Sequence, residues 1–99
     1  MSADEPSPFE LYEKAKVEYA RLRQVRAGTS EWIRFSSTLL EWVMACQAVV
    51  MEKQKAAFDA ARDGMQFAQV SELRTEAKDA LYYVDQLTAL YQRVKQHII

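Results

Sequence analysis

The sequence has few of the residues that build turns and loops. Its 99 residues include only two glycines and two prolines, whereas phosphate-binding and catalytic loops depend on glycine for their tight backbone turns. This scarcity favours long helices joined by short connections. We therefore expect an all-α protein, and a chain of this length has room for one domain with a single core.

Histidine and cysteine are also scarce, and each occurs once. A zinc site needs several such ligands, and a catalytic nucleophile needs a base within hydrogen-bonding distance. His97 should lie exposed in the last helical turn, and Cys46 should be buried and unreactive. Glu72, Glu76 and Asp79 recur at helical spacing, which is typical of a solvated helix face. We predict that the protein is not an enzyme and binds no metal or other cofactor.

No charge of one sign dominates the chain. The net charge is −1 and the isoelectric point about 5.8, so nothing draws the whole protein towards nucleic acid or an anionic membrane. The most apolar stretch, residues 31–51, contains Glu31, Arg34 and Glu41 and is too charged to span a bilayer. The opening residues are acidic and polar, unlike a secretory signal. Together with the lone cysteine, this favours a cytoplasmic protein.

A capping motif marks the start of the first helix. Ser7 suits the N-cap, Pro8 the first helical position, and Glu10 completes a capping box. We predict a disordered lead over residues 1–7 and a helix over about residues 8–27.

Two glycines separate this helix from two longer ones. Gly28 and Gly64 supply the left-handed backbone that commonly follows a helix. We predict helices over about residues 31–62 and about residues 66–97, which short connections make antiparallel neighbours. The third helix carries apolar residues at alternating four- and three-residue spacing, typical of coiled-coil-like packing. These residues are Leu73, Ala77, Ala80, Val84, Leu87, Tyr91, Val94 and Ile98.

The second helix carries two rows of apolar side chains at helical spacing. The first row consists of Trp32, Leu39, Val43, Cys46 and Val50, flanked by Phe35, Trp42 and Val49. The second row consists of Ile33, Leu40, Met44, Met51 and Phe58. Together they cover an arc of roughly 200°, about twice that of an ordinary surface helix. We therefore expect a central second helix covered from two directions, in an antiparallel three-helix bundle with a short first helix and a long hairpin of the other two.

The first helix, at about 20 residues, is too short to cover the whole hairpin. It should pack beside Trp32 and Tyr91, which leaves the far end of the hairpin as two helices only. We predict that a protein partner covers this end, and we expect a homodimer for the isolated chain. The residues predicted to bind this partner are Val50, Met51, Phe58, Met65, Phe67 and Tyr82. The favoured function is a non-catalytic module that acts stoichiometrically on a larger protein, as an inhibitor, a chaperone or an adaptor.

A basic and aromatic stripe on the first helix suggests an alternative function. Aromatic rings stack on bases, and lysine or arginine contacts phosphates. The stripe consists of Tyr12, Lys16, Tyr19, Arg23, Arg26 and Arg34. The same pattern arises when tyrosines pack against a core and basic side chains lie at its margin. Nucleic-acid binding is therefore the less favoured alternative.

Overall fold

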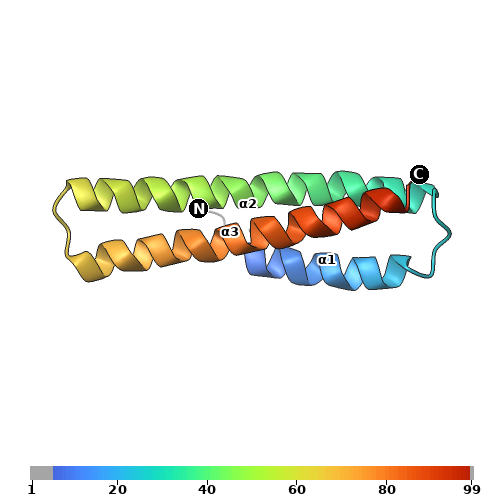
Figure 1. Ribbon diagram of the computed structural model, residues 1–99, viewed down its shortest axis with the longest axis horizontal. Coiled ribbons are helices and arrows are strands. Elements are labelled where there is room, and N and C mark those ends of the chain that lie inside the picture. Colours follow the sequence, from blue (N-terminus) through green and yellow to red (C-terminus); the bar gives the residue numbers. More distant parts are fainter. Residues whose placement is uncertain (1–5, 99) are drawn as a thin grey trace.

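The computed structural model describes residues 6–98, which form three helices and no strand. These are α1 (Pro8–Leu22), α2 (Ser30–Arg62) and α3 (Phe67–Gln96). The long helices α2 and α3 run antiparallel over their whole length, and α1 lies beside one half of that hairpin (Figure 1). The molecule is elongated, measuring 55 × 25 × 16 Å. The predicted all-α, three-helix architecture is confirmed; residues 1–5 of the predicted disordered lead lie outside the described residues.

The start of α1 forms the Ser7 half of the predicted capping box. The Ser7 side-chain oxygen accepts a hydrogen bond from the backbone N–H of Glu10 at 3.2 Å, and Pro8 occupies the first turn. Such a cap satisfies a backbone donor that has no partner within the helix. The helix ends at Leu22, five residues before the predicted end at about residue 27.

The connection between α1 and α2 explains this early end. The carbonyl oxygen of Val25 accepts a hydrogen bond from the indole Nε1 of Trp32 at 3.0 Å. Gly28 has a φ of +82°, and its N–H donates to the carbonyl oxygen of His97 at 2.7 Å. Because these bonds hold the backbone against both α2 and α3, the chain must leave the helical path after Leu22.

The connection between α2 and α3 matches the prediction closely. Gly64 has a φ of +78°, the left-handed conformation expected after a helix. The N–H of Met65 donates to the carbonyl oxygen of Ala60 at 3.0 Å, which closes the last turn of α2. Both long helices begin and end within one residue of the predicted positions.

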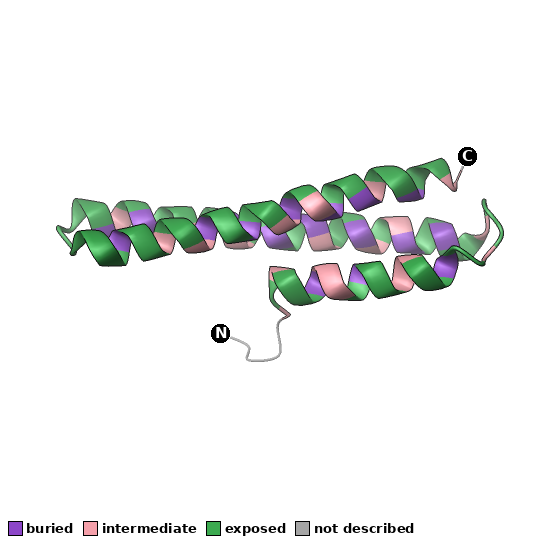
Figure 2. Ribbon diagram, turned by 60° about the horizontal axis from the view of Figure 1, so that its bottom comes forward, coloured by how far each residue is buried: buried purple, intermediate pink, exposed green. Residues whose placement is uncertain are grey.

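The core lies between α2 and α3 and is closed by α1 at one end. All five residues of the first row are buried, as are five of the eight residues at four-three spacing on α3. From α1, the core receives Leu11, Ala15 and Leu22. Figure 2 shows the buried positions on the sides of the helices that face one another. The predicted first row and the predicted seam of α3 are therefore both core elements.

The second row of α2 is exposed, contrary to the prediction that α2 is covered from two directions. Its five side chains are between 46% and 69% exposed. The reason is the position of α1, which approaches the flank of Phe35 and Trp42. At about 100° per residue, this flank lies roughly half a turn around α2 from the second row. The helix α2 is thus one half of a hairpin rather than a central helix.

Candidate functional site

A cleft of about 820 Å³ separates α1 from the first half of α2. It falls within the size range of about 300–1,000 Å³ that is typical of binding pockets. The cleft exists because α1 packs on the α2–α3 hairpin without closing the space beside α2. Its lining residues are Glu13, Lys14, Val17, Glu18, Arg21, Ser30, Glu31, Arg34, Phe35, Thr38 and Trp42.

The base of the cleft is apolar. Phe35 is buried, and Trp42 is half-buried at the margin of the core. Across from them, α1 contributes Val17, which is 71% exposed. Val17 and the exposed part of the Trp42 ring give a surface on which another apolar side chain could pack.

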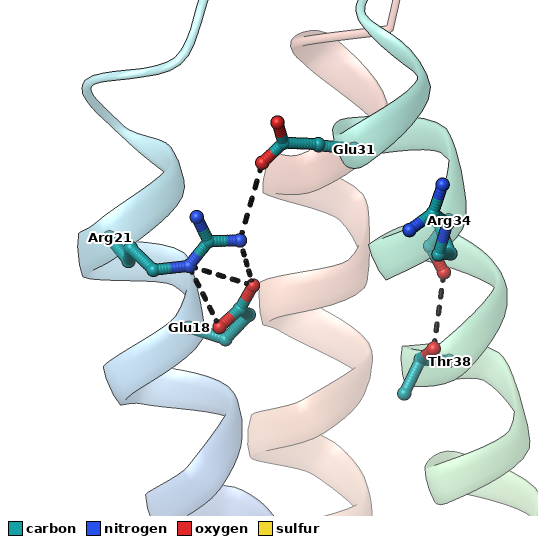
Figure 3. A network of polar contacts seen from close by, with 5 residues as sticks. All are labelled: Glu18, Arg21, Glu31, Arg34 and Thr38. Carbon is teal, nitrogen blue, oxygen red and sulfur yellow. Dashed lines mark hydrogen bonds and ion pairs between the residues drawn. The ribbon is translucent and has the colours of Figure 1, made fainter.

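The rim of the cleft is charged, and part of it forms a network between the two helices. The guanidinium of Arg21 donates from Nε to the Glu18 carboxylate at 3.1 Å and from an Nη atom to Glu31 at 3.4 Å. Figure 3 shows Arg21 lying between the two carboxylates. The hydrogen bond from Arg21 lowers the pKa of Glu18, and the same bond raises the pKa of Arg21. Among residues 6–98, Lys14 and Arg34 on this rim form no ion pair.

The residues predicted to bind a partner at the far end of the hairpin do not form one group. Val50 is buried, because it belongs to the first row and faces α3, so its prediction as a surface residue was wrong. Met51 and Phe58 are exposed members of the second row, and Met65 and Phe67 are exposed beside the connection to α3.

Tyr82 lies apart from that group. Its ring packs edge-on against Tyr83, with centroids 5.1 Å apart, and Tyr83 in turn contacts Phe9 of α1. The side chain is 54% exposed. Its neighbours are therefore at the start of α1, not at the far end of the hairpin.

The basic and aromatic residues of the predicted stripe are divided between two faces. Tyr12, Lys16 and Tyr19 line a depression of about 210 Å³ together with Arg93 of α3. Arg34 lines the cleft on the other side of α1 instead.

Both tyrosine rings of the stripe pack against the protein. The hydroxyl of Tyr12 donates to the side-chain oxygen of Gln86 at 3.5 Å, and Lys16 lies over the Tyr12 ring at 4.9 Å from its centroid. The ring of Tyr19 packs edge-on against Trp32 and His97, each with a centroid distance of 6.0 Å. Arg23 and Arg26 are exposed in the connection after α1. The stripe is therefore not one continuous surface.

The single histidine has a structural contact that the sequence did not reveal. His97 was predicted to be exposed, but its ring stacks on Trp32 with centroids 4.2 Å apart and an interplanar angle of 5°. This contact forms because the end of α3 meets the start of α2, and the Gly28 hydrogen bond holds the same residue by its carbonyl oxygen.

Neither the cysteine nor the acidic residues form a reactive group. Cys46 is fully buried, and burial raises the pKa of its thiol, which disfavours the reactive thiolate. Of the three acidic residues singled out on α3, Glu72 and Asp79 are exposed and Glu76 pairs with Lys53 at 3.2 Å. In the described part of the chain, no group of three or more histidine, cysteine, aspartate or glutamate side chains is placed to hold a metal ion.

Comparisons with known protein families, with curated proteins and with solved structures found no match for this chain. Within residues 6–98, no helix has the length and apolar character needed to cross a membrane.

Proposed function

We propose that the protein is a non-catalytic binding module that takes an amphipathic helix of a larger protein into the cleft between α1 and α2. The observation that carries this proposal is the combination of an apolar lining, with Phe35 and Trp42 at the base and Val17 across from them, and a charged rim. Amphipathic helices bind proteins by laying their apolar face into such a groove. A fourth helix at this position would complete a four-helix arrangement.

The cations on the rim indicate which charges the polar side of the partner helix should carry. Lys14 and Arg34 have no carboxylate partner among the described residues, whereas Arg21 is already held by Glu18 and Glu31. We expect acidic residues on the partner helix beside its apolar face, because they would pair with these two cations at the edge of the contact.

A stoichiometric role follows from this mode of binding. A protein that occupies a helix of its partner can act as an inhibitor, a chaperone or an adaptor, and we place this activity in the cytoplasm because of the single, buried cysteine. Met65 and Phe67, exposed at the far end of the hairpin, are proposed to enlarge the contact with a large partner.

A charge inside the cleft is expected to abolish partner binding without unfolding the protein. Val17→Glu places a carboxylate at an exposed position against the apolar base, whereas Ala20→Glu puts the same charge on α1 outside the cleft. In pull-downs from the source cells followed by quantitative mass spectrometry, we expect Val17→Glu to lower partner recovery at least ~10-fold, the loss of a modest interface contact. Ala20→Glu should behave as the unmodified protein. Equal recovery with both variants would contradict the assignment to the cleft.

Nucleic-acid binding remains the second candidate, because Tyr12, Lys16 and Tyr19 share their depression with Arg93. We expect only weak, non-specific binding, with a Kd no tighter than roughly 10⁻⁴–10⁻⁶ M at physiological salt. A salt titration with labelled DNA and RNA measures this directly. A tighter complex that is lost on Lys16→Glu with Arg93→Glu would place nucleic acid ahead of a protein partner.

A further inference from the structure

Four residues of the exposed second row of α2 have the same spacing when read in either direction along the helix. Ile33, Leu40, Met51 and Phe58 are separated by seven, eleven and seven residues. If a second α2 is laid antiparallel about a two-fold axis, residues at equal distances on opposite sides of the axis face each other across the contact. An axis between residues 45 and 46 brings Ile33 opposite Phe58 and Leu40 opposite Met51. The fifth member, Met44, would face Gln47 of the other copy, because the two residues are equally far from this axis. A contact related by a two-fold axis must be self-complementary in this way.

The amount of apolar surface fits a dimer of two such rows. Five large side chains between 46% and 69% exposed present on the order of 500 Å², in the upper part of the ~300–600 Å² range for the largest patch on a typical monomer. The row extends over roughly 37 Å of helix at 1.5 Å per residue. With its polar flanks, this approaches the ~800 Å² that each partner contributes to a standard interface.

The charges along one edge of the row give attractive and unfavourable pairs in equal number, so the register rests on the apolar row. Because two-fold symmetry brings like edges together, Arg34 of one copy would lie within a helical turn of Asp59 of the other. The carboxylate of Asp59 also pairs with Arg62 of its own chain at 3.5 Å. The pair of Arg34 with Asp59 occurs twice. Glu41 of one copy would approach Glu52 of the other at the same offset along the helix, and this unfavourable pair also occurs twice. Both side chains are exposed on this edge of α2.

We infer that two copies of this chain pair through the second rows of their α2 helices, antiparallel about a two-fold axis that passes between residues 45 and 46. The contact brings Ile33 against Phe58 and Leu40 against Met51 of the other copy. Its apolar residues lie on the opposite side of α2 from Phe35 and Trp42, so the dimer leaves these two residues of the cleft uncovered and shares only Arg34 of the rim with it.

The mass of the protein in solution tests whether the row is covered by a second copy. Light scattering over a dilution series is expected to show twice the chain mass of 11.5 kDa at high concentration. Leu40→Glu with Met51→Glu puts carboxylates opposite one another and should raise the dimer Kd at least ~30-fold, with unchanged helicity. Val17→Glu, which changes a 71% exposed residue of α1 outside the row, should leave the dimer intact. A mass of one chain at the highest concentration would overturn the inference.

Cross-linking tests the antiparallel register. In separate samples of Ile33→Cys and of Phe58→Cys, the new thiols lie at opposite ends of the contact, and a short bismaleimide should not join them. A mixture of the two variants should cross-link readily. The unmodified chain controls for Cys46, whose buried thiol should not react. Cross-linking within either single variant would show a parallel or different contact.

Charge changes provide a second test of register. Arg34→Glu should weaken the dimer, and Arg34→Glu combined with Asp59→Arg should restore it. Glu41→Lys should strengthen the dimer, because it replaces each unfavourable pair with an attractive one across the axis. If Glu41→Lys weakens the dimer as much as Arg34→Glu does, the proposed register is wrong.

Discussion

Replacing Trp32 with alanine is expected to lower the free energy of unfolding by about 3–5 kcal/mol, the range for deleting a buried large aromatic side chain. Trp32 is fully buried and is the largest such side chain among the described residues. Its side chain contacts α3, α1 and the α1–α2 connection at the end of the bundle where all three helices meet. Its ring stacks on His97 at the end of α3 and packs edge-on against Tyr19 of α1, while its indole donates to the carbonyl oxygen of Val25.

Urea unfolding followed by circular dichroism measures this loss, and two further variants identify its source. Trp32→Phe keeps an aromatic ring but removes the hydrogen bond to Val25, so it should lower the free energy of unfolding by less than Trp32→Ala does. We expect a loss of about 1–3 kcal/mol, because the carbonyl group of Val25 is left without a partner. Trp42→Ala should also cost less than Trp32→Ala, because Trp42 is only half-buried at the base of the cleft. If Trp32→Ala and Trp42→Ala proved equal, Trp32 would not be the residue that holds this end together.

The helices could be predicted because their ends are determined locally. Ser7 and Pro8 start α1 through bonds and backbone angles within one turn, and Gly28 and Gly64 adopt the left-handed conformation that the sequence led us to expect. The end of α1 could not be predicted in the same way. It depends on a hydrogen bond from Trp32 and on one to His97, both of which join residues brought together only by the fold.

The contact of His97 illustrates the same limit for a single side chain. Its place in the last turn predicted exposure, and helical periodicity placed it away from the seam of α3. The structure instead lays its ring flat on Trp32, because the elongated hairpin brings the end of α3 to the start of α2. A tertiary contact between chain ends of this kind has no signature in local sequence.

The cleft and the exposed second row both result from the side on which α1 packs, which the periodicity of the sequence does not reveal. The sequence showed correctly that α2 carries two apolar rows, but an apolar row can be covered by the same chain or by another. Which one applies depends on the side from which α1 approaches. The structure places α1 on the flank of Phe35 and Trp42, and so it leaves open both the space beside that flank and the row on the opposite side.

Two adjacent leucines of α2 allow this difference between the rows to be measured. Leu39 belongs to the first row and is fully buried, whereas Leu40 belongs to the second row and is 46% exposed. Leu39→Ala is expected to lower the free energy of unfolding by about 2–5 kcal/mol, since it removes packing and leaves a cavity between α2 and α3. Leu40→Ala makes the same chemical change one residue later and should cost less than about 1 kcal/mol in the isolated monomer.

Unfolding at low and at high protein concentration separates what Leu40 contributes to the stability of the single chain from what it contributes to the stability of the dimer. At a concentration low enough for the single chain to dominate, urea unfolding of Leu40→Ala should nearly match that of the unmodified protein. At high concentration the unmodified protein gains stability from the second copy, and Leu40→Ala should gain less. Leu39→Ala should be destabilised by a similar amount at both concentrations, because its contacts lie within one chain. Equal losses for the two leucines in the dilute protein would mean that the second row is covered within the monomer, and both the exposed row and the dimer built on it would have to be abandoned.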